Sequence, residues 1–226
     1  MDAFLKAPAH YKRLAELLEA PGRLLVLDTS ALLTEMGLED LKATEEHRER
    51  APYLRLLAEE TATLLRETPE LVVSGSVRLE TDNALRKKDN ALKGAAHAEF
   101  AAVVAAAEEA HARSRERFAP DQEAVKEVSR ILLRLTEPKS YDSKPVSRTD
   151  TGVAAQGHYL RGKGHEVAIA TSDCDIDWAC AAFRKNRVWL AGRHAAAFGY
   201  WGAHNDVIPV YRPAWVAHAP SRARYP

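Results

Sequence analysis

The sequence predicts an α/β fold with a mostly parallel central sheet flanked by helices. Short apolar runs alternate four or five times with longer segments of helical periodicity. The first run, RLLVL (23–27), shows no polar alternation, which is typical of a strand buried on both faces. The chain has 226 residues, of which 46% are hydrophobic, and contains no internal repeat. We therefore expect a single domain over residues 1–226 with one core.

Apolar spacing and capping residues define the elements of the first half. We expect helices over residues 3–19, 31–37, 53–66 and 77–88, with a second strand at 71–74. Thr29-Ser30 and Ser76 are the expected helix caps, and Gly37 is the expected helix end. Residues 39–50 are dense in charge and fit either a solvated helix or a mobile connection.

The second half begins with an alanine-rich stretch from Asn90 to about Leu135. Its composition predicts two long helices separated at Pro120, and a hairpin of these two helices is one possible arrangement. A loop should cover 137–148 and a glycine turn 162–164. We expect helices over residues 151–160 and 175–183, strands at 166–170, 187–191 and near 206–211, and a frayed end at 219–226.

Charge and cysteine content exclude several classes of protein. The 32 Lys and Arg residues balance 32 Asp and Glu residues, which excludes a basic histone-like coat and an acidic tail protein. Cys174 and Cys180 are too few for a disulfide scaffold or a four-thiolate zinc site. No apolar run approaches the roughly 18 residues of a membrane span, and the N-terminus lacks signal-peptide architecture. We expect a soluble, cytoplasmic protein with no membrane partner.

Acidic residues follow two of the predicted strands. Asp28 comes directly after RLLVL, and Asp173 and Asp175 follow EVAIATS. Glu80 and Asp150 lie near the starts of two predicted helices. Because functional groups gather at the carboxyl ends of parallel strands, these carboxylates are candidates for one shared pocket.

Such convergence favours a bound cation. Two carboxylates about 4 Å apart repel by roughly 4 kcal/mol at an effective dielectric near 20. Oxygen ligands without histidine or thiolate indicate Mg²⁺ or Mn²⁺ and not zinc.

Each acid also has a purely structural interpretation. Asp28, Asp150 and Asp173 stand where helix N-caps are expected, and Glu80 fits a solvated helix face. Taken one at a time, these interpretations are favoured, whereas the order of all four acids along the chain favours a shared site.

Four segments, VLDTSALL, VVSGSVRLE, TDTGVAAQG and VAIATSDCD, occur in an order that resembles the PIN-domain nuclease family, particularly its toxin-type ribonucleases. The resemblance implies a PIN-like three-layer fold and an acidic pocket that binds Mg²⁺ or Mn²⁺ and cleaves RNA. The spacings between the acids are longer than in the compact toxins, so residues 90–136 would be a helical insertion. The chain could also bind an antitoxin or another protein partner, or form a homodimer, and the sequence does not choose among these.

The resemblance also assigns residues. Its catalytic metal ligands would be Asp28, Glu80, Asp150 and Asp173, with Asp175 as an additional metal ligand. Hydroxyl groups beside the metal would come from Thr29, Ser30 and Thr171.

Basic, aromatic and thiol residues add weaker signals. Arg86, close to Glu80 in sequence, is the best candidate for a contact with the RNA backbone. The nine histidines form no zinc-hydrolase motif, and His158 and His165 are expected at surface or turn positions. Cys180 is expected to be a core thiol. Trp189, Trp201 and Trp215 are expected to pack in the core or near the C-terminus.

Together these observations predict a metal-dependent endoribonuclease. The alternatives are a structure-specific DNA nuclease of the same superfamily and a catalytically inactive PIN-like module that binds a protein. A haloacid-dehalogenase-type phosphatase is disfavoured because Ser30 stands where that chemistry needs a second aspartate.

Overall fold

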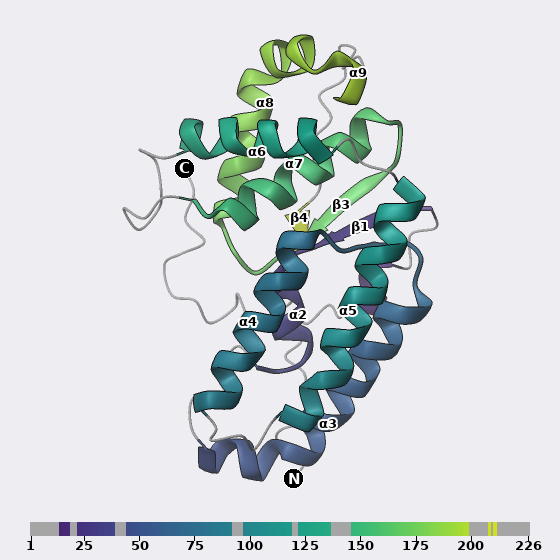
Figure 1. Cartoon of the computed structure of the whole chain (residues 1–226), viewed down its shortest axis with the longest axis vertical. Helices are drawn as coiled ribbons and strands as arrows, with labels where there is room; N and C mark the ends of the chain where they lie inside the picture. The colour runs from purple at the N-terminus through teal and green to yellow at the C-terminus, as the bar shows by residue number, and fades with distance from the viewer. Residues whose placement is uncertain are drawn as a thin grey trace.

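Four parallel strands form a small sheet at the middle of the molecule (Figure 1). The computed structural model describes residues 14–18, 22–38, 44–91, 97–118, 122–136, 146–198, 208 and 210–211. Within this part of the chain the strand order is β2-β1-β3-β4. The strands are β1 (Leu24–Leu27), β2 (Leu71–Val72), β3 (Val167–Ala170) and β4 (Val210–Tyr211). The α/β prediction is confirmed, and strands were correctly predicted at these four places.

The central strand β1 joins distant parts of the chain. Leu25 is in register with Leu71 of β2 on one side and with Ala168 of β3 on the other. All residues of β1 and β3 are buried. Their apolar side chains on both faces agree with the expectation of strands covered by helices.

Helices cover both sides of the sheet. They are α1 (Leu14–Leu17), α2 (Thr29–Glu35), α3 (Thr44–Glu67), α4 (Gly75–Ala91), α5 (His97–Phe118), α6 (Gln122–Thr136), α7 (Arg148–Gly162), α8 (Asp175–Arg193) and α9 (Ala195–Phe198). Figure 1 shows α3, α4 and α5 extending to one side, while α6, α7, α8 and α9 lie on the other.

The two alanine-rich helices diverge instead of forming a hairpin. Helix α5 packs mainly on α3 and α4, and α6 packs mainly on α7 and α8. Both contribute to one continuous core, with Phe100 and Val103 from α5 and Val128 and Leu132 from α6. The hairpin interpretation was wrong because each helix buries its apolar face against a different layer.

The strand expected at 187–191 was also wrong, since these residues lie in α8. Val188 is 81% exposed and Trp189 is 53% exposed, while Leu190 is buried. Helical periodicity turns this apolar run partly toward solvent, which a short buried strand does not allow. Trp189 is therefore not a core residue, and Trp201 and Trp215 lie outside the described residues.

Helix starts differ by a few residues from the predicted ones. Asp28, and not Thr29 or Ser30, is the N-cap of α2. The Val77 amide donates to the Ser74 hydroxyl at the start of α4, in place of the expected Ser76. Ser147 is the N-cap of α7. In each case a residue that precedes the predicted helix supplies the cap.

Cys180 and His158 both lie in the core. Cys180 is buried, as expected, and burial raises the pKa of its thiol to about 12. His158 is buried and not at the surface, with its ring stacked on Phe183 at a centroid distance of 3.8 Å. Burial lowers its pKa to about 3, so this imidazole is neutral at physiological pH.

The expected start of the first helix, the charged segment, the loop before α7 and the chain end fall partly or wholly outside the described residues. Residues 3–13, 39–43, 137–145 and 219–226 lie outside the described part of the chain. Among the described helices, none combines the length and apolar character needed to cross a membrane.

The contact between α7 and α9 generates a stability prediction. A Cβ atom at Gly162 would lie 1.7 Å from the carbonyl oxygen of Phe198, whereas one at Gly192 would meet nothing within 4 Å. Gly162→Ala should therefore push α9 away and lower the Tm by roughly 3–10 °C. Gly192→Ala, in an exposed helical position, should leave the Tm unchanged or slightly raised. Thermal unfolding followed by circular dichroism measures both, and equal Tm values for the two variants would contradict the close packing.

Candidate functional site

Four acidic side chains from four separate segments line one pocket of about 610 Å³. Asp28 follows β1, Asp173 follows β3, Glu80 lies on α4 and Asp150 lies in the first turn of α7. The pocket thus opens at the carboxyl ends of two neighbouring parallel strands, where α/β proteins place their ligands. The other polar lining residues are Thr29, Ser30, Ser76, Asn83, Lys87 and Thr149.

Asp28 is the most firmly held of the four acids. It is buried, and its Oδ2 accepts hydrogen bonds from the Ser30 amide (3.3 Å), the Ser30 hydroxyl and the Thr171 hydroxyl (2.8 Å). Its own amide donates to the Ala170 carbonyl at 3.0 Å and so continues the β1–β3 pairing. The backbone and side chain of Asp28 are therefore fixed by different parts of the chain.

Hydroxyl groups connect the loops that follow β1 and β3. Ser30 Oγ lies 3.1 Å from Thr171 Oγ1 and accepts a hydrogen bond from the Ser172 amide at 2.9 Å. The Asp173 amide donates to Thr171 Oγ1 at 2.9 Å. Asp173 is thus positioned relative to Asp28 by two short polar side chains.

Glu80 is brought to the pocket by the packing of α4 on α2. Its Oε2 accepts a hydrogen bond from the Thr29 hydroxyl at 3.1 Å. Thr29, Ser30 and Thr171, which the sequence assigned to the site, therefore each hydrogen-bond to one of the pocket acids.

Asp150 takes part in a capping box at the start of α7. The Ser147 amide donates to Asp150 Oδ2, and the Asp150 amide donates to Ser147 Oγ, both at 3.1 Å. Burial, together with the negative charges of Asp28 and Asp173, raises the pKa of Asp150 to about 7, and the hydrogen bonds from Ser147 act in the opposite direction. Burial also raises the pKa of Asp28, despite the hydrogen bonds from Ser30 and Thr171.

These raised pKa values indicate that the pocket disfavours negative charge on its own carboxylates. Such a site gains stability from protons or from a bound cation. The pocket offers carboxylate and hydroxyl oxygens, and among its described lining residues there is no histidine or cysteine. This donor set fits Mg²⁺ or Mn²⁺.

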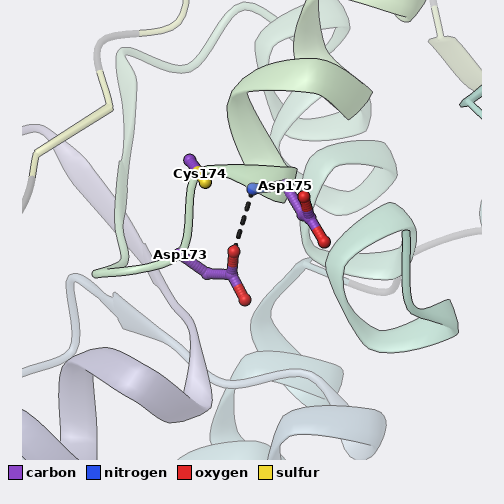
Figure 2. A group of neighbouring side chains, drawn as sticks. All are labelled: Asp173, Cys174 and Asp175. Carbon is purple, nitrogen blue, oxygen red and sulfur yellow. Dashed lines mark hydrogen bonds between the residues drawn. The ribbon is translucent and has the colours of Figure 1, made fainter. Parts of the chain in front are cut away.

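A tighter group lies at the N-terminus of α8 (Figure 2). Among the described residues, Asp173, Cys174 and Asp175 are the only three potential metal ligands whose ligand atoms all lie within 4.8 Å of one another. The Asp175 amide donates to Asp173 Oδ1 at 2.9 Å. Asp175 is not among the residues that line the acidic pocket. The four pocket acids are spread more widely, which suits an ion that keeps several of its waters.

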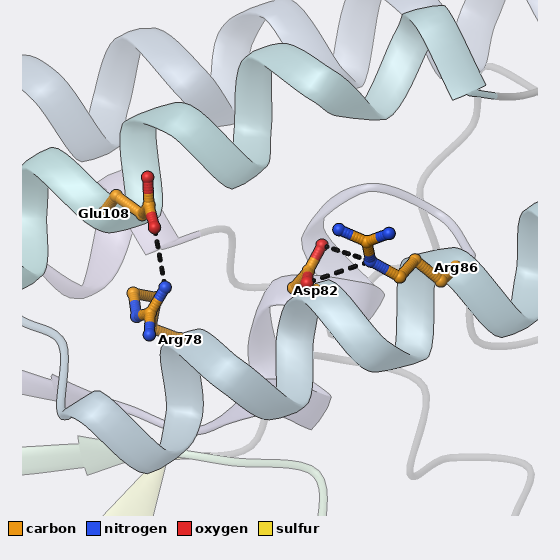
Figure 3. Close-up of polar contacts among 4 residues, drawn as sticks. All are labelled: Arg78, Asp82, Arg86 and Glu108. Carbon is orange, nitrogen blue, oxygen red and sulfur yellow. Dashed lines mark hydrogen bonds and ion pairs between the residues drawn. The ribbon is translucent and has the colours of Figure 1, made fainter.

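Among the described residues that line the pocket, Lys87 is the one cation, and Arg86 is not part of the lining. Arg86 is 68% exposed, and its Nε donates to both oxygens of Asp82 at 3.1 and 3.0 Å (Figure 3). Helical spacing explains the difference. Lys87 is seven residues after Glu80 and shares its face of α4, whereas Arg86, at six residues, is turned away.

The same spacing accounts for three further pocket residues that the sequence prediction did not select for the site. Ser76, Asn83 and Lys87 lie four residues before, three after and seven after Glu80, and all three line the pocket. A position on the same helical face as Glu80 therefore predicts a pocket residue better than nearness to Glu80 in the sequence does.

Comparison with protein-family models, with curated proteins and with solved structures found no match to this chain.

The buried carboxyl group of Asp150 generates a prediction for stability against pH. In the folded state its pKa is about 7, compared with 3.8 for an ordinary aspartate. Between these pH values the folded chain keeps a proton that the unfolded chain has lost. The free energy of unfolding therefore falls as pH rises, by up to about 1.4 kcal/mol per pH unit for this group.

Asp150→Asn removes this titration while keeping an oxygen that accepts from Ser147. In EDTA, the variant should match the wild type near pH 4 and be more stable at pH 8, by on the order of a few kcal/mol. Denaturant unfolding across this range measures the difference. Asp82→Asn, on the exposed side of α4, is the control. Parallel curves for wild type and Asp150→Asn would contradict the assignment.

Proposed function

We propose that this chain is a metal-dependent endoribonuclease that hydrolyses RNA phosphodiester bonds in the acidic pocket. One observation carries the proposal: Asp28, Glu80, Asp150 and Asp173, from four distant segments, line the same pocket. Two of these carboxyl groups are buried and have raised pKa values. Burying carboxyl groups close together is unfavourable, and a cation bound between them would offset that cost.

Asp28 and Asp173 are the carboxylates best placed to hold Mg²⁺ or Mn²⁺. The Ser30 and Thr171 hydroxyls bond to the carboxylate of Asp28, whereas Asp173 is held at its amide by Thr171 and at its carboxylate by the Asp175 amide. Glu80 from α4 and Asp150 from α7 complete the set of oxygen donors. When bound, the cation would lower the pKa of a coordinated water and supply a nucleophile for attack on phosphorus. Thr29, Ser30 and Thr171 then act as positioning residues, since each hydrogen-bonds to an acid of the pocket.

The remaining pocket residues suit a phosphodiester. Lys87 adds a positive charge on the α4 wall, while Ser76, Asn83 and Thr149 add neutral hydrogen-bonding groups. A polyanion approaching four carboxylates needs such compensation. The order of the acids along the chain, which resembles the PIN-domain family, is an independent support for this function.

A protein-binding module without activity is the second candidate. Its support is that Asp28 is the N-cap of α2, as the purely structural interpretation expected, and that Asp150 has a structural role as the third residue of the capping box whose N-cap is Ser147. Capping alone does not require Glu80 and Asp173 to share their pocket, so we favour the enzyme. A cytoplasmic location, a homodimer and an antitoxin or other protein partner stay predictions.

Cleavage assays with single substitutions test the nuclease. Labelled single-stranded RNA and DNA are incubated with the protein in Mg²⁺, Mn²⁺ or EDTA. Wild type should cleave RNA only with metal, and Glu80→Gln, Asp150→Asn and Asp173→Asn should each lose roughly a hundredfold or more of the rate.

Asp82→Asn is the matched control for Glu80→Gln, because it removes a carboxylate from the same helix two residues away but outside the pocket. Equal losses in these two variants would contradict the site. Absence of cleavage by folded wild type would favour the binding module, and cleavage of DNA alone would favour the DNA nuclease.

The two neighbouring cations of α4 allow a second test. Lys87→Ala should raise the KM for RNA by roughly three- to tenfold at low salt, since its charge faces the pocket. Arg86→Ala should have a smaller effect because Arg86 pairs with Asp82 on the outer surface. Steady-state kinetics at two salt concentrations compare the variants. A larger effect for Arg86→Ala would return Arg86 to the substrate-binding role predicted from the sequence.

A further inference from the structure

A larger cavity of about 940 Å³ lies beside the acidic pocket. Its walls come from α5, α6, the first part of α7 and the turn between β2 and α4. Helices α5 and α6 both line it, and Figure 1 shows these two helices diverging toward opposite sides of the sheet. Ser76 lines both this cavity and the acidic pocket, so the two adjoin at the start of α4.

The side chains around this cavity carry one sign of charge. Its charged lining residues, within the described ranges, are Arg115, Lys126, Arg130, Arg134 and Arg148, with no aspartate or glutamate. Lys126 pairs with Glu123 at the surface, whereas the four arginines form no ion pair with any described residue. In a chain of zero net charge, this segregation creates a local positive potential.

The cavity also has an apolar part. Val72, Val73, Val125 and Leu133 contribute to its lining between the arginines. A surface that combines guanidinium groups with apolar area suits a ligand that has both phosphates and flat rings.

A smaller hollow of about 450 Å³ continues on the far side of α6. Arg130 and Arg134, one helical turn apart, line both hollows and form the ridge between them. The smaller hollow adds Trp189, which is 53% exposed, with the Arg193 guanidinium 5.8 Å from its ring centroid. Glu127 also lines this hollow and pairs with Arg193 at 3.1 Å, so the positive charge here comes from Arg130 and Arg134. An exposed indole beside arginines is a platform on which a base can stack.

We propose that these two hollows form a binding track for single-stranded nucleic acid, leading from the acidic pocket at Ser76 across the Arg130–Arg134 ridge to Trp189. This inference rests on the proposed function and names the path of its substrate. The arginines bind successive phosphates, the apolar lining accommodates bases, and Trp189 stacks on a base several nucleotides from the bond that is cleaved. Sequence-independent binding follows, because backbone charge and stacking carry the affinity.

Fluorescence anisotropy with labelled ten-nucleotide RNA and DNA strands tests the track in EDTA, where binding is separated from cleavage. Arg130→Ala/Arg134→Ala should weaken binding by at least about tenfold and reduce the slope of log affinity against log salt by about 1.4 for two lost phosphate contacts. Trp189→Ala should weaken binding by about tenfold without changing that slope.

The charge-matched control is Arg23→Ala/Arg66→Ala, which removes two arginines paired with Glu166 and Glu109 outside the hollows. It should bind both strands nearly as wild type does. Inorganic polyphosphate, which has no bases, serves as a competitor. It should bind more weakly than a strand, and its affinity should not change in Trp189→Ala.

The outcomes separate this inference from the proposed function. Strand binding with the expected losses, but no cleavage with metal, supports the track and contradicts the nuclease. Metal-dependent cleavage with unchanged KM and affinity in both track variants overturns the track and leaves the nuclease standing. Equal affinity for polyphosphate and strands, or no strand binding by folded protein, also overturns the track.

Discussion

The hydrogen-bond network between Asp28, Ser30 and Thr171 is the constraint on which the site depends. It joins the loop after β1 to the loop after β3, two segments that are distant in sequence but adjacent in the sheet. Thr171 donates to Asp28 and accepts from the Asp173 amide, so one buried hydroxyl fixes two acids. Ser30 does the same between Asp28 and Ser172. The parallel pairing of β1 and β3 thereby becomes a fixed spacing of carboxylates.

The same residues serve the fold and the site, so the two interpretations of the acids are compatible. Asp28 is the N-cap of α2 and also a wall of the pocket, and Asp150 completes a capping box while facing the same space. Helix N-termini favour negative charge, which lowers part of the cost of burying these groups. The raised pKa of both shows that the cost is only partly offset.

The divergence of α5 and α6 determines what surrounds the acids. Because the two helices pack on opposite layers, they leave the basic cavity between them instead of filling it. The chain has no net charge, yet its acids meet at the strand ends and several of its arginines meet next to them. Opposite charges side by side in separate hollows suit a ligand whose phosphates need both a cation site and direct contacts.

The sequence by itself determined what local patterns control. RLLVL and EVAIA could be recognised as buried strands from their continuous apolar character, and the long alanine-rich helices from their composition. The order of the acids predicted a shared pocket, which all four do line. Tertiary structure decided the rest. Whether α5 and α6 pair, whether 187–191 is strand or helix, and whether His158 is buried depend on which surface each segment meets. Lys87 in place of Arg86 was decided by how α4 is rotated against α2, because a rotation of one residue about a helix changes which side chain faces the site.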